Sequence, residues 1–523
     1  MKTLPLDWKW LAGVVGLGAL CGVSANLSRL TWDPGPSGRE WDYPANWQGE
    51  PGEWPDEARE EAYFATPALQ PLLDQSVPQL GRLTFATAGW VIEQEGTSLY
   101  TITFSHISND YNAVYSAGAG TNVVLPGVAF TVNGQNIYSA ANNVLIVRRF
   151  VGPNACVFSS TTPAQENTGM IVLDGNNNGV TQPFVVRQGT VVVAHPQALG
   201  SSTGTVYLGD SWTATNARVR VLAGTNGLVM TKPLEVRDVG GVTVTLGCAS
   251  GITNAVLSGP ITLQRGATFL ADTGAVVQVN GRVSGPGALI KGGAGTLVLA
   301  SPQNVYTGGT HVLAGVVRVV TNRGMGVGPV MVSNAVLELW PGVVVSNTIT
   351  ARSGTVRGQG IVMGPLRLEP GSRIAPGFSV GRLTAETLLM ASGSIYEVEL
   401  SGSGTGQYDV VELVASGTVQ SATLHPVLSY EPVLGDVLTI IEVQGSGQVS
   451  GAFAGYPEGG LVMIPGGLKQ HIFRVTYIGG VGSNDMQLVC VPEGGAGQAT
   501  VVLGLLMVAK EEKRLRPKWL SRF

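Results

Sequence analysis

Side chains that could act as acids, bases or nucleophiles are sparse through the middle of the chain. Polysaccharide cleavage needs carboxyl groups that converge on one face. Only Glu235 and Asp238 lie close in sequence, and the stretch LEVRDVGG places them on opposite strand faces or in a turn. No Ser-His-Asp or nucleophile-elbow pattern accompanies the scattered histidines. The sequence therefore predicts no catalytic residues. The acids between residues 96 and 395 are Asp110, Glu166, Asp174, Asp210, Glu235, Asp238, Asp272, Glu338, Glu369 and Glu386, and the histidines are His106, His195, His311, His425 and His471.

One short stretch, DGNNNG at 174–179, has the beginning of a calcium loop. Oxygen ligands stand at its first, third and fifth positions, and Gly179 is at the sixth. The twelfth position, where a bidentate Glu belongs, is Val185. We interpret the stretch as a turn. The GGVGSND stretch at 479–485 is similar to one copy of a Gly-Asp calcium-binding repeat. One copy cannot form such a site, because the ligands come from consecutive turns, so we interpret the stretch as a connection between strands.

The cysteines do not form a metal or disulfide framework. They are Cys21, Cys156, Cys248 and Cys490, with no CxxC pair and no Cys/His cluster at zinc-ligand spacing. We expect no metal and no cofactor.

The composition narrows the class of protein. Charged residues are 13% of the 523 residues, about half the typical share of about 25%. Gly is 73 of the 523 residues, about twice average usage, and hydrophobic residues are 44%. Short Val, Leu and Ile runs between Gly, Asn, Ser and Thr indicate many short strands and turns. The net charge of −4 gives no electrostatic footprint for nucleic-acid binding.

The stretch GGAGTLVLASPQNVYTGGTHVLAG, residues 292–315, has no ionisable Asp, Glu, Lys or Arg. We interpret TLVLA and HVLAGVVRVV as strands, and SPQN and YTGG as turns. A strand that stacks on copies of itself forms apolar ladders inside and hydroxyl ladders outside. Like charges stacked at about 4.8 Å would repel, so low charge suits a solenoid.

An internal repeat supports this interpretation. With an offset of 126 residues and no gap, Asn178 aligns with Asn304, Gly189 with Gly315 and Gly200 with Gly326. Such self-similarity is typical of repeat architectures. At roughly 20–25 residues per coil, Cys156 and Cys248 are about four coils apart, so we expect no disulfide between them.

The N-terminus has the pattern of a secretory signal peptide. Lys2 and Lys9 precede an apolar run, and Val23-Ser24-Ala25 supplies small residues, which predicts cleavage between Ala25 and Asn26. Leu20 before Cys21 argues against a lipoprotein signal.

Four tryptophans gather in the Pro-rich segment that follows. Trp32, Trp41, Trp47 and Trp54 could stack on sugars, because indoles are amphipathic. The interpretation we favour is a cap in which Trp32, Trp41 and Trp47 plug the open N-terminal end of a solenoid.

The stretch GAGTLVLASPQNVYTGGTHVLAGVVRV resembles the passenger-associated repeat of autotransporter-type proteins. The segments PGFSVGRLT, YEVEL, YDVVEL, GDVLTII and VTYIGG resemble the C-terminal portion of such chains. TWDPGPSGREWDYPANWQG resembles their N-terminal Trp-Asn-Trp segment. The resemblance implies an exported right-handed parallel β-helix. No segment resembles a translocator barrel, so we expect a protein that does not translocate itself.

The C-terminal tail resembles a PEP-CTERM sorting signal. The motif Val491-Pro492-Glu493 precedes an apolar run at 499–509 and a basic block. Gly494 stands where Pro is expected, and the run is too short to span a bilayer. The resemblance implies a sorting peptidase as partner, cleavage near Pro492-Glu493 and transient membrane contact through the tail.

Together these features predict an all-β chain, a right-handed parallel β-helix with a β-rich C-terminal portion, an N-terminal signal helix and a short tail helix. The predicted function is an exported, non-catalytic structural or adhesin-like protein of the bacterial cell surface, outer membrane or extracellular matrix. Its expected partners are the export machinery and a surface polysaccharide. The alternative is a carbohydrate-active β-helix enzyme, a lyase or hydrolase, with an unmarked site. The predicted segments are a signal peptide (1–25), a Trp/Pro-rich cap (26–78), a β-helix (79–395) with repeats at 169–208 and 295–334, a β-rich portion (396–490) and a sorting tail (491–523).

Overall fold

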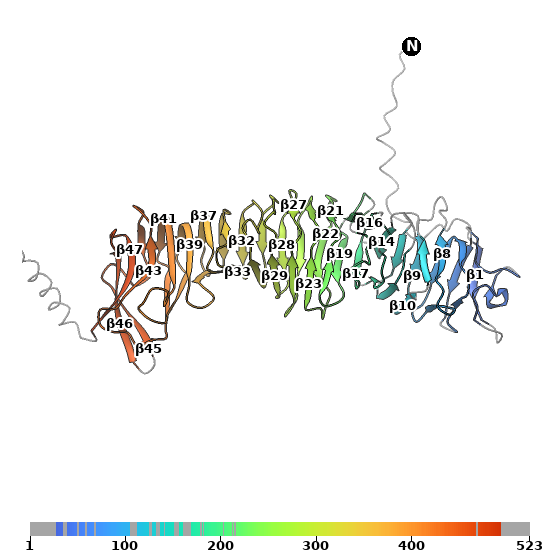
Figure 1. The fold of residues 1–523 in the computed structure, drawn as a ribbon, viewed down its shortest axis with the longest axis horizontal. Coiled ribbons are helices and arrows are strands. Elements are labelled where there is room, and N and C mark those ends of the chain that lie inside the picture. The colour runs from blue at the N-terminus through green and yellow to red at the C-terminus, as the bar shows by residue number, and fades with distance from the viewer. Residues whose placement is uncertain are drawn as a thin grey trace, which may run out of the picture. The chain divides into compact units, whose positions relative to one another are not determined.

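A computed structural model shows a chain built almost wholly of β-strands (Figure 1). Among the described residues, a single helical turn is present, the 3-10 helix η2 (Pro44–Asn46). The predicted signal helix, the cleavage site at Ala25 and Asn26, and the tail from Glu493 onward lie outside the described residues. The structure describes residues 28–34, 39–49, 52–57, 60–66, 69–104, 112–124, 128–131, 136–140, 142–150, 156–160, 169–177, 180, 183–201, 203–211, 213, 216–466 and 469–492.

The chain divides into two compact units, residues 1–310 and 311–523. In the first unit, successive turns of the chain stack as coils, and each strand pairs in parallel with the corresponding strand of the next coil. Complete coils contribute three strands, one to each of three sheets, which is the arrangement of a parallel β-helix. The all-β, parallel-sheet prediction is confirmed. The right-handed sense stays a prediction, in line with the general rule for parallel crossovers.

The strands of the first unit are these, in the order in which they pair. Sheet 1 contains β2 (Trp47–Gln48), β1 (Ser28–Trp32), β3 (Glu60–Phe64), β6 (Arg82–Phe85), β9 (Asn112–Ser116), β12 (Asn136–Ser139), β14 (Cys156–Ser160), β16 (Phe184–Val186), β18 (Val206–Leu208), β21 (Leu234–Val236), β24 (Ile261–Leu263) and β27 (Val283–Ser284). Sheet 2 contains β4 (Leu72–Leu73), β7 (Val91–Gln94), β10 (Gly120–Val124), β13 (Asn143–Val147), β15 (Met170–Leu173), β17 (Gly189–Val193), β19 (Arg218–Ala223), β22 (Thr243–Cys248), β25 (Ala267–Leu270) and β28 (Leu289–Gly292). The third position is taken by β5 (Val77–Leu80), β8 (Tyr100–Phe104) and β11 (Val128–Thr131) in early coils, and by β20 (Leu228–Met230), β23 (Asn254–Leu257), β26 (Val276–Val279) and β29 (Thr296–Leu299) in later ones.

In the second unit two strand series run in parallel, and the chain ends in an antiparallel sheet. The long strand β37 (Ile361–Leu368) pairs in parallel with both β34 and β35. The register shifts partway along its pairing with β39 (Arg382–Met390), and again partway along the pairing of β39 with β41. One series contains β32 (Val330–Ser333), β34 (Val344–Val345), β35 (Ile349–Arg352), β37 (Ile361–Leu368), β39 (Arg382–Met390), β41 (Val410–Gln420), β43 (Val437–Val443) and β44 (Val449–Ala452). The other contains β31 (Val316–Val319), β33 (Val336–Leu339), β36 (Thr355–Gly358), β38 (Arg373–Pro376), β40 (Ile395–Leu400) and β42 (Thr423–Leu428). The antiparallel end is β45 (Leu461–Gly466), β46 (Lys469–Gly479) and β47 (Asp485–Val491), and β30 (Thr310–Val312) lies where the two units meet in sequence.

Parallel pairing extends beyond the predicted 79–395 segment at both ends. It begins with β1 and β3, inside the segment predicted as a cap, and it continues through β41 and β44 as far as Ala452. The β-rich portion predicted at 396–490 therefore contains both parallel strands and the antiparallel end.

The strand predicted for HVLAGVVRVV is two strands. β30 and β31 are separated by a bend at residues 313–315, where Gly315 has a φ of +63°. A positive φ is costly for residues other than Gly, so Gly315 allows the chain to turn there. The strand predicted for TLVLA matches β29.

The two repeat copies end in the same turn. Gly200 N–H donates to Gln197 O at 3.0 Å, and Gly326 N–H donates to Arg323 O at 3.1 Å, both with the predicted offset of 126. The buried turn amides are Asn177 and Asn304, however, so the first copy carries its structural Asn one position before the aligned Asn178. Their Oδ1 atoms each accept a backbone N–H, from Phe150 and Val283 respectively, at 2.7 Å.

The core of the first unit is a set of inward ladders, in which one position repeats from coil to coil. Val221, Leu246 and Phe269 are in register on β19, β22 and β25, and all are buried. Lys291 on β28 continues this ladder with no exposed surface, and its Nζ donates to Gly292 O and Gly293 O at 2.7 and 2.6 Å. Burial lowers the pKa of Lys291 to about 8.

Charged residues on the strands also form ladders, and their signs alternate. In the second unit, Glu338 on β33 is directly in register with Arg318 on β31 and with Arg357 on β36. Glu338 is 1% exposed, and its carboxylate accepts from Arg318 Nε at 2.7 Å and from Arg357 Nε at 3.1 Å. When strands stack in register, like charges at the same position of neighbouring strands repel and opposite charges attract. Charged residues are therefore tolerated where positive and negative side chains alternate from strand to strand.

The first unit repeats this arrangement at its beginning. Arg29, Glu61 and Arg82 are in register on β1, β3 and β6. Glu61 is 5% exposed and contacts Arg29 Nε at 2.8 Å and Arg82 Nε at 4.0 Å. Thr84 Oγ1 donates to the same carboxylate at 2.6 Å.

We predict that Glu338→Gln lowers the free energy of unfolding of the second unit by about 2 kcal/mol, because Arg318 and Arg357 on the two flanking strands then lose the buried carboxylate that lies between them. The matched control is Glu369→Gln, whose partner Arg352 is exposed and whose pair should contribute less than about 1 kcal/mol. Chemical denaturation of the purified chain measures both. Equal effects of the two substitutions would contradict the ladder interpretation.

Candidate functional site

Three of the four clustered tryptophans are buried at the first coil of the first unit. Trp32, Trp41 and Trp47 are at most 5% exposed. Trp47 contacts Trp32 and Trp41 edge to face, with ring centroids 5.0 Å apart in each pair. All three rings pack on Phe64 of β3, at centroid distances of 5.6 to 6.0 Å. These three indoles therefore present no face to a ligand.

Hydrogen bonds fix the same three rings. Trp47 Nε1 donates to Trp41 O at 2.7 Å, Trp32 Nε1 donates to Leu69 O at 2.8 Å, and Trp41 Nε1 donates to Pro55 O at 3.4 Å. A buried indole N–H needs such a partner. β2, which carries Trp47, pairs antiparallel with β1 and so lies at the outer edge of sheet 1. The geometry supports a role as an N-terminal cap, whereas Trp54 is half-buried.

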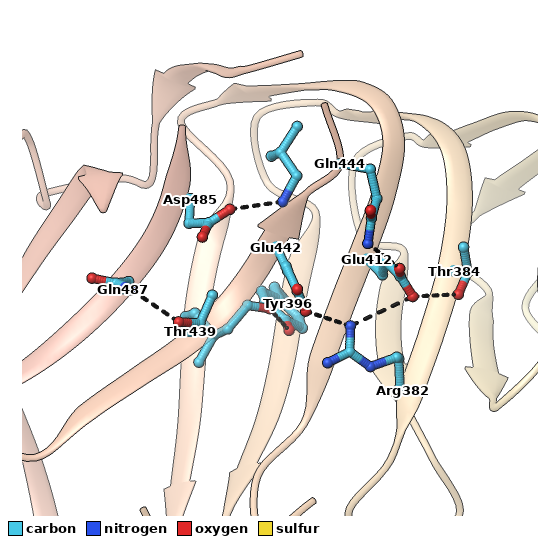
Figure 2. A network of polar contacts seen from close by, with 11 residues as sticks. Arg382, Thr384, Tyr396, Glu412, Thr439, Glu442, Gln444, Asp485 and Gln487 are labelled. Carbon is cyan, nitrogen blue, oxygen red and sulfur yellow. Dashed lines mark hydrogen bonds and ion pairs between the residues drawn. The ribbon is translucent and has the colours of Figure 1, made fainter. Parts of the chain in front are cut away.

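A polar network lies on strands β39, β41 and β43 of the second unit, and Figure 2 shows its side chains pointing toward one another. Glu412 and Glu442 are directly in register, which would place two like charges side by side. Arg382 Nη1 contacts Glu442 Oε2 at 2.5 Å and Glu412 Oε2 at 3.4 Å. Thr384 Oγ1 and Gln444 Nε2 donate to Glu412 at 3.0 and 2.5 Å.

The network is arranged to neutralise its acids. Each carboxylate is held by Arg382, and Glu412 accepts two further hydrogen bonds. A general acid or base must be able to exchange a proton with a substrate, so carboxylates in such pairs are poorly placed for catalysis. This arrangement stabilises the stack at a point where two acids coincide.

Beneath this network, Asp409 and Tyr396 are buried polar groups. Asp409 is 1% exposed, and its two oxygens accept N–H groups from Gly381 and Glu399, each at 2.8 Å. Burial raises the pKa of Asp409 to about 7, although both backbone hydrogen bonds act in the opposite direction. Tyr396 donates its hydroxyl hydrogen to Ile440 O at 2.6 Å, and burial raises its pKa well above the usual value.

Asp42 and Asp74 are a further pair of interacting carboxyl groups. Burial, a hydrogen bond with Asp42 and the charge of Asp42 together raise the pKa of Asp74 to about 6. The sequence does not reveal this pair, because the two residues are distant in sequence. The Glu40–Leu72 bridge between the segments that carry them is the feature that brings them together.

Of the eight acids between residues 96 and 395 that the structure describes, five contact an arginine: Asp174, Asp210, Glu235, Glu338 and Glu369. Glu338 and Glu369 are described above, and Asp210 contacts Arg187 at 2.8 Å. Asp174 contacts Arg148 Nε at 3.2 Å. Within the described part of the chain, no group of three or more His, Cys, Asp or Glu side chains has the arrangement of a metal site. Asp110, Glu166, Asn178 and Gly179 lie outside the described residues, and Cys248 and Cys490 are buried free thiols.

Val491 is the last residue of β47, where it is in register with Ile472 of β46. Pro492 follows it directly and is the last described residue. The motif Val491-Pro492-Glu493 therefore starts on a strand. No helix in the described ranges is both long and apolar enough to cross a bilayer.

Comparison with known protein families gives a match over one segment of the chain. Residues 289–319 match the passenger-associated-transport-repeat family. These residues include β28, β29, β30 and β31. The chain thus contains a passenger-associated transport repeat within an all-β, parallel-stranded architecture.

One solved structure that the chain matches is the crystal structure of the Haemophilus influenzae Hap adhesin. The two chains share 10% sequence identity, and the TM-score is 0.27. The match covers 82% of this chain and 64% of the adhesin chain, so this chain spans less than two thirds of the length of that structure. No curated protein sequence matches the chain.

We predict that Trp47→Ala destabilises the first coils by about 3 kcal/mol, because it removes a ring buried among two indoles and Phe64. Trp54→Ala is the control and should cost about 1 kcal/mol or less. Hydrogen exchange of the β1 and β3 amides measures the local opening. Unchanged exchange in Trp47→Ala would exclude the cap.

Proposed function

We propose that the protein is an exported, non-catalytic structural or adhesin-like β-helix protein of the bacterial cell surface or extracellular matrix. The observation that carries the proposal is the passenger-associated transport repeat at residues 289–319 within a parallel-stranded architecture. Passenger segments of autotransporter-type proteins are carried to the outside of the cell, and this property comes to the chain by that match. The export machinery would be its first partner.

The repeat residues in the first unit serve packing, which supports a structural role. Leu297 and Leu299 of β29 point into the core with no exposed surface. Tyr306 is fully buried, and its hydroxyl lies 2.6 Å from Thr310 Oγ1. A Cβ at Gly308 would lie 2.5 Å from Ala288 N, so only Gly fits this close approach of two coils.

The arrangement of charge also favours a non-catalytic role. The most buried strand carboxylates, Glu61 and Glu338, each lie between two arginines. Glu412 and Glu442 share Arg382. A carbohydrate-active enzyme, the alternative, would require unpaired carboxyl groups facing a substrate.

The tail adds a proposal about destination. A PEP-CTERM-like signal would be held briefly in the membrane through its apolar run and recognised by a sorting peptidase. Cleavage near Pro492 and Glu493 would then release the protein or attach it at the surface. Pro492 follows β47 directly, so cleavage after it would remove no strand residue.

The test is to insert an epitope tag between β45 and β46 and fractionate the cells that make the protein. We predict tagged protein at the surface or in the medium, digestible by protease added to intact cells. Its N-terminus should be Asn26, and mass spectrometry should place its C-terminus near Pro492.

Two results would count against the proposal. Tagged protein that stays in the cytoplasm would refute export. Surface protein that retains Phe523 would refute cleavage of the tail while leaving the surface location intact. A variant that ends at Pro492 is the matched control, because it keeps every strand that the structure describes and lacks the sorting signal.

A further inference from the structure

Exposed aromatic rings are rare on this protein. Among the aromatic side chains whose burial the structure describes, the exposed ones are Tyr43, Trp340 and Phe378. Tyr43 belongs to the first unit, whereas Trp340 and Phe378 of the second unit contact each other edge to face, with ring centroids 6.3 Å apart and planes at 69°. Tryptophan is usually well buried, so a Trp that is 41% exposed beside a Phe that is 48% exposed calls for an explanation.

The two rings come from alternate coils of a single strand series, because β36 lies between β33 and β38. Trp340 follows β33 directly, and its N–H donates to Val319 O at 3.1 Å. Phe378 follows β38 by two residues. In the coil between them, Gln359 directly follows β36, and its N–H donates to Leu339 O at 2.9 Å. The surface row Trp340, Gln359 and Phe378 is called the aromatic row below.

A turn directs Phe378 away from the core. Gly377 has a φ of +89°, and a Cβ there would lie 2.0 Å from Ser379 O, so only Gly allows this turn. The loop is fixed at both sides, because Gly377 N–H donates to Gly358 O at 2.7 Å and Gly381 N–H donates to the buried Asp409 at 2.8 Å. The ring is thus presented by a well-anchored loop, as a preformed site requires.

Cationic side chains lie beside the aromatic row. The guanidinium carbon of Arg318 is 5.5 Å from the centre of the Trp340 ring. Arg318 and Arg357 are 35% and 43% exposed and share one carboxylate, Glu338, which is 1% exposed. This ladder therefore carries one excess positive charge on its exposed side, on a chain whose net charge is −4.

Aromatic faces with planar hydrogen-bonding groups at their edge are suited to sugar rings. An indole stacks on the apolar C–H face of a sugar, and guanidinium and amide groups bind its hydroxyl and carboxylate oxygens. A protein partner would be expected to need a larger apolar patch than two rings. The excess positive charge favours a sugar that bears a negative group.

We propose that Trp340 and Phe378, with Arg318 and Gln359 beside them, form a binding platform for an acidic polysaccharide. This inference deepens the proposed adhesin-like role and rests on it, since a surface location would bring the platform to such polymers. It also assigns glycan contact to different residues from the buried N-terminal tryptophans.

The experiment uses the purified full chain and hexasaccharides of defined composition. Isothermal titration would compare polygalacturonate and hyaluronan fragments with neutral cellohexaose. We expect the acidic fragments to bind at least tenfold more tightly than cellohexaose, with affinity that falls as salt rises. Trp340→Ala and Phe378→Ala should each weaken binding about tenfold, and Trp340→Phe should weaken it less.

Tyr43→Ala is the matched control, because it removes an exposed aromatic ring elsewhere and should leave binding unchanged. Circular dichroism checks that each variant keeps its β-structure. The proposal is overturned if none of the fragments binds, if cellohexaose binds as tightly as the acidic fragments, or if Trp340→Ala binds like the unmodified chain. Binding by a protein that fractionation finds in the cytoplasm would refute the proposed export alone, and surface protein without binding would refute the platform alone.

Discussion

The parallel in-register pairing of successive coils is the constraint on which the other features depend. Because each strand position has its counterpart about 4.8 Å away on the next coil, whatever side chain occupies a position meets its neighbour directly. Apolar side chains gain from this and form ladders such as Val221, Leu246 and Phe269. Charged side chains are tolerated where their signs alternate, as in Arg318, Glu338 and Arg357. The low share of charged residues, 13%, follows from this constraint.

The same constraint explains the ends of the stack. An open coil leaves strand edges unpaired and the core exposed. At the beginning of the first unit, β2 covers the edge in antiparallel orientation and three tryptophans fill the core above Phe64. In the second unit, the chain closes with the antiparallel strands β45, β46 and β47. The strand pairs that run antiparallel therefore involve the first strands of the first unit and the last strands of the second, where a cap is required.

Much of the architecture could be predicted from the sequence, because turns and strands follow local rules. The sequence predicts the Gly and Asn turns and the strand at 296–299. It also predicts the turn shared by 195–200 and 321–326. The change of sheet at Gly315 depends on how the coils stack, since an apolar run does not reveal where it crosses between sheets. Two other features depend on register between distant segments: the buried Lys291 and the Arg-Glu-Arg ladders. The aromatic row was missed for the same reason, because Trp340 and Phe378 become neighbours only through stacking.

Crosslinking of cysteine pairs tests the register of the stack most directly. Thr245 on β22 is directly opposite Thr268 on β25, and Thr268 is opposite Ile290 on β28. A Thr245→Cys/Thr268→Cys variant should form a disulfide on mild oxidation, because adjacent parallel strands bring the two Cα atoms within the required range of about 4.4 to 6.8 Å. A Thr245→Cys/Ile290→Cys variant should not, since two strand spacings separate its cysteines by about 10 Å. Efficient crosslinking of the second pair, or failure of the first, would contradict the in-register parallel stack.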